Sequence, residues 1–229
     1  MELDYVIPIR FKAPFRMGSG HGRAGLFDHS TILDGRGWAY LPGSAIKGKL
    51  RHLCHRLVVT LAKQGNATPL NFAELCPAKT LPTAAEAKQT AQGHPARFCP
   101  PLSPCAFCRL FGSPANQGKY RFLDGVLTSE GDSAMDFVTD FGTSESAYLA
   151  TVQTEPRDQV SLVRSRGVTG RGKLFTAENG ARYLSFKAHV KGPPDADVEL
   201  LLRYAHRCLT HLGADGCTGL GRLEDGGNG

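Results

Sequence analysis

The segment Leu41–Arg51, LPGSAIKGKLR, constrains the fold more than any other part of this sequence. Proline and glycine end an extended segment, and a serine directly after them is a favoured helix N-cap. Apolar residues then recur at helical spacing as far as about Ala62. We therefore expect a strand, a turn and a long amphipathic helix capped by Ser44, with this apolar stripe: Ala45, Ile46, Leu50, Leu53, Leu57 and Val58.

The rest of the chain alternates between strand and helix patterns and indicates an α+β fold. A sheet with helices on one face in a ferredoxin-like split βαβ arrangement is the natural candidate. Residues 63–104 are rich in proline and show little alternation, so they predict an irregular insertion. The other expected elements are strands at 5–17, 29–33, 37–42 and 121–128, a polar hairpin arm that returns into a strand at 183–190, a helix at 197–212 and a short terminal strand.

The 229 residues carry a formal net charge of +6. An excess of that size favours an anionic partner such as nucleic acid, although a basic protein without such a partner remains an alternative. No apolar run reaches the roughly 20 residues of a membrane span, and the acidic, alternating start is unlike a targeting peptide. We expect a cytoplasmic protein with no membrane partner.

Seven cysteines in a chain with no export signal favour metal binding over a disulfide framework. Cys99, Cys105 and Cys108 form a C-x5-C-x2-C pattern, with Cys76 upstream. Four thiolates on proline-containing turns suit tetrahedral zinc, which would organise an insertion that has few apolar residues. The alternatives are unrelated reduced thiols, or a different fourth ligand in place of Cys76: His94, His52 or His55.

The remaining cysteines lie among apolar or glycine-rich neighbours. Such thiols usually behave as small buried hydrophobic groups. We therefore expect three buried thiols without a metal: Cys54, Cys208 and Cys217.

The start of the predicted helix is a candidate phosphate site. Free N–H groups and the positive end of a helix dipole attract phosphate. Lys47 and Arg51, at i and i+4, share one face, and Ser44 can donate from the cap. Lys49 adds a third cation. The alternative is an ordinary solvated basic face.

Two glycine-rich loops, GSGHGR from Gly18 and GCTGLGR from Gly216, would let the backbone approach a ligand closely. Neither loop matches a Walker or a dinucleotide-binding motif. Each is weak evidence taken singly.

The arm carries five cations against one acid, Asp158, which suits contact with a nucleic-acid strand, although an ordinary solvated hairpin is the alternative. The five cations are Arg157, Arg164, Arg166, Arg171 and Lys173.

Asp28, His29 and Asp34 stand beside the first glycine loop. Carboxylates near a phosphate site often hold a divalent ion or move a proton. By itself, Asp28 is better explained as a turn residue than as a catalyst.

Together and in this order, these segments resemble the repeat-associated mysterious protein (RAMP) superfamily, and within it the backbone subunit of type III CRISPR effector complexes. LPGSAIKGKLR is similar to the family's P-G-S-S-[LI]-K-G-x-[LI]-R signature, with Ala45 as the departure. CRLFGSP followed by YRFLDGVL, and LGADGCTGLGRLE, resemble two further family segments. The likeness is weakest across residues 61–98.

The resemblance implies a modified RNA-recognition-motif core, a zinc-bearing lid and a β-hairpin thumb within a single domain. The corresponding ranges are core 1–62, 119–146 and 176–224, lid 63–118, thumb 147–175 and a disordered tail 225–229. It also implies that copies of the chain stack with other type III subunits along a CRISPR RNA. The implied RNA contacts are Ser44, Lys47, Lys49, Arg51, Gly18, Ser19, Gly20, Gly219, Gly221 and the thumb cations Arg157, Arg164 and Arg166.

The resemblance further implies cleavage of the complementary single-stranded target RNA, with Mg²⁺ or Mn²⁺, at one aspartate. Asp28, fourteen residues before Pro42, stands at the matching position, and Asp34 ranks second. Two alternatives stay open: a capping subunit that binds RNA without cutting it, and a guide-processing nuclease that would use His21 or His29 as a base.

Overall fold

The structure is a computed structural model that describes residues 2–18, 20, 22, 27–64, 104–113, 116–128, 153–163, 165 and 168–224. Its contacts form two compact units, which are described separately. Unit 1 comprises Met1–Val6, Ile46–Leu123 and His189–Leu209, and unit 2 comprises Ile7–Ala45, Asp124–Ala188 and Thr210–Gly229. The expected division into core, lid, thumb and tail stays a prediction.

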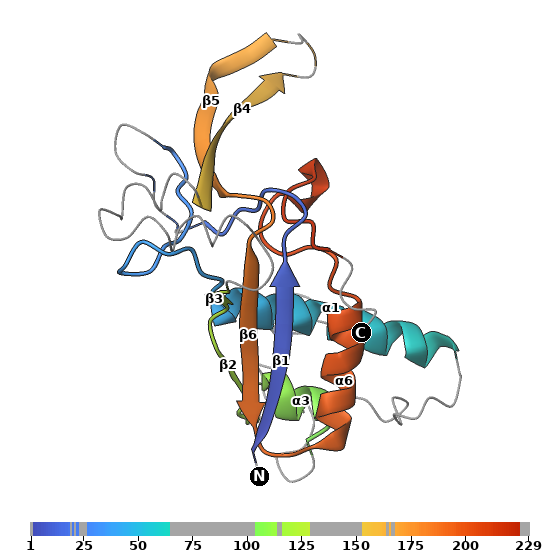
Figure 1. Ribbon diagram of the computed structural model, residues 1–229. Helices are drawn as coiled ribbons and strands as arrows, with labels where there is room; N and C mark the ends of the chain where they lie inside the picture. The colour runs from blue at the N-terminus through green and yellow to red at the C-terminus, as the bar shows by residue number, and fades with distance from the viewer. Residues whose placement is uncertain are drawn as a thin grey trace. The chain divides into compact units, whose positions relative to one another are not determined.

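A four-stranded sheet contains β1 (Leu3–Arg10), β6 (Ser185–Gly192), β2 (Arg121–Phe122) and β3 (Val126–Leu127). Figure 1 shows β1 and β6 side by side and running in opposite directions. Both β2 and β3 pair with β6 in antiparallel register. Every second residue of β6 is buried, which is the pattern of a strand with one face on a core.

The polar arm is a two-stranded antiparallel hairpin, as expected. It consists of β4 (Thr154–Val163) and β5 (Val168–Gly180). The register shifts between Val160 and Leu162, the sign of a bulge that strengthens the local twist.

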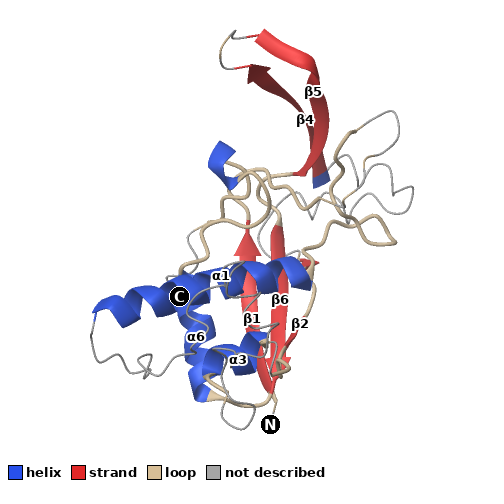
Figure 2. Ribbon diagram, turned by 180° about the vertical axis from the view of Figure 1, so that it is seen from behind, coloured by secondary structure: helices blue, strands red, loops and turns tan. Residues whose placement is uncertain are grey.

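Three α-helices are described: α1 (Gly43–Gln64), α3 (Ala106–Phe111) and α6 (Ala196–Arg207). In unit 1, α3 packs against α6, as Figure 2 shows from behind. The apolar stripe of α1 is buried at Ile46, Leu50 and Leu53. Within the part of the chain that the structure describes, no helix combines the length and apolar character needed to cross a membrane.

Several expected elements differ from the structure. Isolated bridges replace the strands expected at 29–33 and 37–42. In both segments, backbone pairing with another segment occurs at single residues and not over consecutive ones. The strand expected at 121–128 is split into β2 and β3. The last helix ends at Arg207, before the predicted 212, and α3 was not predicted at all.

Aromatic rings fill the centre of unit 2. Phe11 and Phe15 stack with their ring centroids 3.9 Å apart, and Phe186 meets both edge-on at 5.8 and 5.6 Å. All three side chains are at most 2% exposed. Gly180 exchanges backbone hydrogen bonds with Phe15, and a Cβ on Gly180 would lie 2.2 Å from the Phe15 ring. The missing side chain of Gly180 therefore makes room for this ring.

In unit 1, Arg109 joins α3 to the start of α6 through ion pairs with Asp195 and, at 3.2 Å, with Asp197. The Arg109 guanidinium donates to both carboxylate oxygens of Asp195, at 2.6 and 3.0 Å. Asp195 is also the N-cap of α6, since its Oδ1 accepts from the backbone N–H groups of Asp197 and Val198. Burial raises the pKa of Asp195, but Arg109 and the N–H donors lower it overall below the ordinary 3.8.

We expect Asp195→Ala to lower the free energy of unfolding by about 2 kcal/mol at neutral pH, from the lost cap and the lost charge-assisted pair. Because the folded-state pKa is depressed, this stability is fully present above the unfolded pKa near 3.8 and is lost as the pH falls through the lower folded value. Denaturant unfolding of the parent and of Asp195→Ala from neutral to acidic pH measures this difference in the free energy of unfolding. A difference that stays constant down to the lowest accessible pH contradicts the role of the ionised carboxylate.

Candidate nucleic-acid interface

The helix that carries the candidate phosphate site begins at Gly43, before the predicted cap residue Ser44. The Gly43 N–H donates to Asp124 Oδ1 at 2.7 Å, so the carboxylate of Asp124 meets the free end of the helix. The prediction that Ser44 is the N-cap is therefore wrong, because an acceptor from a distant segment takes that place. Ser44 lies in the first turn with its side chain exposed.

Two cations on one face of α1 lie over aromatic rings in unit 1. Lys47 Nζ is 5.6 Å from the centroid of the Phe122 ring, and the Arg51 guanidinium carbon is 5.8 Å from that of Phe107. Phe111 joins the two rings, stacked on Phe122 at 5.7 Å and tilted against Phe107 at 5.0 Å. We call Lys47, Arg51, Phe107, Phe111 and Phe122 the cation–aromatic face. Cation–π contacts hold its two charges in place without neutralising them.

Among the described residues, no acid forms an ion pair with the cations of this face. No acidic residue stands in the first turn of α1, and in the described ranges no ion pair involves Lys47, Lys49 or Arg51. Lys47 and Lys49 are half-buried, whereas Arg51 is exposed. This arrangement can bind an anion such as a phosphodiester.

The two predicted glycine loops belong to unit 2. The backbone leading into the first loop contacts the second, since Gly221 N–H donates to Pro14 O at 2.7 Å and Ala214 N–H donates to Arg16 O at 3.0 Å. Gly219 has positive φ and open space where a Cβ would stand, so its backbone is accessible. Gly221 differs, because a Cβ there would lie 2.1 Å from Leu212 O.

The other predicted contacts are only partly described. Gly18 forms a bridge with Thr31, and Gly20 has positive φ with open space around it. Arg157 is exposed on β4. Three predicted RNA contacts lie outside the described residues: Ser19, Arg164 and Arg166.

Asp28 lies at the base of the hairpin in unit 2. Its Oδ2 accepts the Thr176 N–H at 2.9 Å, and its own N–H donates to Thr176 O at 2.9 Å. The Thr176 hydroxyl donates to Asp158 Oδ1 at 2.7 Å, so two carboxylates flank this threonine. The neighbouring His29 ring meets Phe175 edge-on at 5.7 Å. Asp28 is exposed, and for its Oδ1 no hydrogen bond is seen within the described residues.

Asp34, the second-ranked acid, is used within its own turn. Its Oδ1 accepts the N–H groups of Arg36 and Trp38, at 2.9 and 2.8 Å. The Arg36 guanidinium lies 3.6 Å from Oδ2. Asp34 is therefore a turn-forming residue here.

Two of the four predicted zinc ligands are described. Cys105 is the half-buried N-cap of α3, and Cys108 is fully buried in the first turn of that helix. Cys76 and Cys99 lie outside the described residues, as does His94. His52 and His55 are on α1, exposed and half-buried respectively. In the described ranges, no three metal-ligating side chains form a group.

Of the three cysteines expected to be buried without a metal, only Cys54 is buried, and burial raises the pKa of its thiol. Cys208 and Cys217 are exposed, so that expectation is wrong for both. The physical reason is that α6 ends at Arg207 and leaves Cys208 in its cap, while Cys217 stands on a 3-10 turn, Gly216–Thr218.

Sequence reasoning missed Asp124 and the three rings of the cation–aromatic face. Phe107 and Phe111 are spaced i, i+4 in AFCRLF, which is a helical spacing, but the segment is too short for that spacing alone to predict a helix. Asp124, directly before Gly125, carries a turn signal inside the expected strand. The pairing of Asp124 with Gly43 has no signal in the sequence, because the two residues are far apart in the chain.

Comparison with known structures identifies the fold. A chain of type III-B Cmr-beta, determined by cryo-EM with cognate target RNA bound, aligns with TM-score 0.59 and 11% identity over 97% of this chain and 96% of that one. The apo state gives TM-score 0.58 at the same identity and coverage. Cmr6 from Pyrococcus furiosus aligns with TM-score 0.50 and 17% identity over 98% of this chain and 99% of that one.

Identities this low show the fold alone. Among curated proteins, none is significantly similar in sequence. The family is shown by the sequence itself, since the model of the RAMP superfamily matches residues 9–224. The mixed α/β fold with antiparallel sheets agrees with that match. The chain therefore belongs to the RAMP superfamily.

Proposed function

We propose that this chain is an RNA-binding subunit of a type III CRISPR effector complex and that its cation–aromatic face binds the RNA backbone. The observation that carries the proposal is the placement of Lys47 and Arg51, on one helix face, each over a ring, with no acid paired to them in the described ranges. The net charge of +6 and the structural likeness to type III-B Cmr proteins support it. The proposed partners are CRISPR RNA, single-stranded target RNA, further copies of this chain and other type III subunits.

The experiment is RNA binding by the full chain against its Lys47→Ala/Arg51→Ala variant over a range of salt concentrations. We expect affinity to fall about tenfold, because two charge-assisted contacts are lost. The slope of log K against log salt should become shallower by about 1.4, since each phosphate contact on a single strand contributes about 0.7.

Arg203→Ala/Arg207→Ala is the matched control. These two arginines are also exposed and spaced i, i+4, on α6, and Arg203 is ion-paired with Glu199, so the control removes the same formal charge from a helix where an acid is paired to it. Two results contradict a site at the cation–aromatic face. One is a salt slope that stays unchanged in Lys47→Ala/Arg51→Ala, and the other is an equal reduction of that slope in the control.

For cleavage, we propose that Asp28 is the catalytic carboxylate of a metal-dependent endoribonuclease reaction on target RNA. Its exposed position at the hairpin base, with one oxygen not bonded in the described ranges, fits this role. Mg²⁺ or Mn²⁺ can be bound by one or two carboxylates together with substrate phosphates, so Asp28 and Asp158 suffice as protein ligands. When bound, the ion would stabilise charge on the reacting phosphate.

The chain's own residues would position the RNA for this reaction. The hairpin would separate one nucleotide from its neighbours, so that its 2′-hydroxyl could attack the adjacent phosphate in line. A 2′,3′-cyclic phosphate would form as the bond from phosphorus to the 5′-oxygen breaks, and that oxygen would leave with a proton from water. Asp28 would orient that hydroxyl or accept its proton. Guide pairing would provide sequence specificity.

A second candidate, a capping subunit that binds RNA without cutting it, is favoured by one observation. The Asp28 carboxylate accepts the Thr176 N–H, so it has a structural use that needs no catalysis. The variants described in the Discussion separate the two.

We also propose structural zinc held by Cys76, Cys99, Cys105 and Cys108. In support, Cys105 and Cys108 stand at the cap and in the first turn of one short helix, α3. Metal analysis of the purified chain should give about one zinc per molecule, and Cys105→Ser should lose it. Less than about a tenth of an equivalent in the parent protein contradicts the site.

A further inference from the structure

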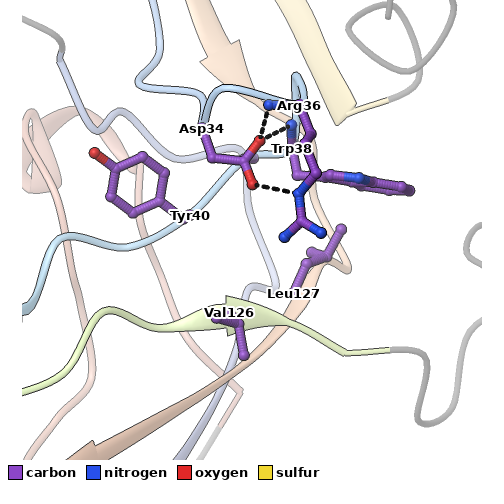
Figure 3. Close-up of a pocket in the computed structure, with 7 residues that line it drawn as sticks. Asp34, Arg36, Trp38, Tyr40, Val126 and Leu127 are labelled. Carbon is purple, nitrogen blue, oxygen red and sulfur yellow. Dashed lines mark hydrogen bonds and ion pairs between the residues drawn. The ribbon is translucent and has the colours of Figure 1, made fainter. Parts of the chain in front are cut away.

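A small pocket of about 190 Å³ opens in unit 2. Its walls come from the turn Asp34–Tyr40 and from β3. Figure 3 shows Asp34 with Tyr40 on one side and with Arg36 and Trp38 on the other. Val126 and Leu127 provide the apolar part of the lining. None of the residues named so far as RNA contacts lines this pocket.

The backbone of this turn presents the aromatic side chains outward. Ala39 and Leu41 are buried, whereas Trp38 and Tyr40, which alternate with them, are only half-buried. The Ala39 N–H donates to Gln153 Oε1 at 2.7 Å, and Leu41 exchanges hydrogen bonds with Gly125. The segment is thus fixed on its inner side, and its aromatic residues remain available to a ligand.

The turn is held in place before any ligand arrives. Asp34 Oδ1 accepts two backbone N–H groups, and Asp34 N–H donates to Trp38 O at 2.8 Å. Burial raises the pKa of Asp34, but these N–H donors and the Arg36 guanidinium lower it overall, so the carboxylate is ionised and paired. The two N–H donors offset part of its charge. The Arg36 side chain is still 84% exposed.

We propose that this pocket binds one unpaired nucleobase of the RNA, stacked on Trp38, with Arg36 at its edge. The proposal rests on the RNA-binding function above and adds a base-binding site to it. Bases stack on aromatic side chains and on guanidinium planes, and this is how proteins hold single-stranded RNA.

The size and charge of the pocket favour this occupant. Sites for drug-sized ligands usually measure about 300–1,000 Å³, so this pocket suits a single ring system. The exposed cation Arg36 favours a ligand that carries phosphate next to its ring, which a nucleotide does. A paired base cannot enter, because both of its faces are covered by neighbours in the duplex.

Trp38 is the only tryptophan in the chain, so its fluorescence reports directly on the pocket. The experiment titrates the full chain with a single-stranded oligoadenylate, with an abasic ribose-phosphate oligomer of equal length and with a double-stranded RNA. We expect oligoadenylate to quench the Trp38 emission, and we expect neither the abasic oligomer nor the duplex to do so.

Binding of labelled oligoadenylate, followed by anisotropy, supplies the second readout. Stacking of one base is worth a five- to roughly hundred-fold change in affinity, so Trp38→Ala should weaken binding by about that factor. Tyr204→Ala is the matched control, because Tyr204 is an exposed aromatic on α6 that does not line the pocket. It should bind as the parent does.

The outcomes separate this inference from the proposed function. If oligoadenylate binds with unchanged Trp38 emission and Trp38→Ala keeps the parent affinity, the base site is wrong and the RNA-binding function stands. Equal quenching by the abasic oligomer also overturns the base site, since it shows backbone contact alone. If no RNA binds, both the proposed function and this inference fail.

Discussion

Asp28→Ala should lower the rate of target RNA cleavage by the assembled, guide-loaded complex at least about 100-fold, because a positioned acid–base or metal-binding carboxylate contributes roughly that much or more. Guide RNA binding should change little, since the cation–aromatic face is untouched. Single-turnover cleavage of labelled target RNA, measured with excess complex, gives the rate.

Asp28→Asn separates catalysis from structure at this position. An asparagine oxygen can still accept the Thr176 N–H, but the negative charge is gone. If Asp28 is catalytic, both variants lose cleavage. If Asp28 only holds the hairpin base, cleavage by a complex that contains the asparagine variant is unchanged. The catalytic group then lies elsewhere in the complex, which favours the capping-subunit alternative for this chain.

Phe15→Ala should give the largest loss of stability among the changes considered, about 3–5 kcal/mol in the free energy of unfolding. The ring is fully buried and packs against both Phe11 and Phe186. Gly180→Ala should cost about 1–3 kcal/mol, because its Cβ would collide with a ring that these neighbours hold in place. Denaturant unfolding measures both changes.

Gly48→Ala is the matched control for Gly180→Ala. It makes the same chemical change in α1, where no atom lies within 4 Å of the added Cβ. It should stabilise by up to about 1 kcal/mol, since alanine favours helix more than glycine does. In the Phe15→Leu background, Gly180→Ala should lower the free energy of unfolding by less than it does in the parent, because the ring that its Cβ would meet is gone. Equal effects of the two glycine changes would contradict the packing argument.

Elements with a strong repeating pattern could be predicted from the sequence. The first strand, the helix after Gly43 and the polar hairpin each depend mainly on local alternation and local turn residues. The first strand nevertheless ends at Arg10 and not at the expected residue 17. The short helix Ala106–Phe111 was missed, because six residues between cysteine- and proline-containing turns give too short a pattern. The break between β2 and β3 was missed because the hydrogen bond from Gly43 to Asp124 joins residues far apart in the chain.

The residues of the candidate site likewise form two groups: those that local spacing predicts and those that only tertiary packing places. Lys47 and Arg51 could be placed on one face, because i, i+4 spacing on a helix is a local property. The rings beneath them could not, since Phe107 and Phe122 reach α1 only through tertiary packing. The Asp28–Thr176 contact likewise depends on how the hairpin base folds back onto the N-terminal segment.

A structure of the chain with bound guide RNA tests the central claim most directly. The account predicts a backbone phosphate within salt-bridge distance, about 4 Å, of both Lys47 Nζ and the Arg51 guanidinium. RNA bound along another surface, with both side chains in contact with solvent alone, would contradict it.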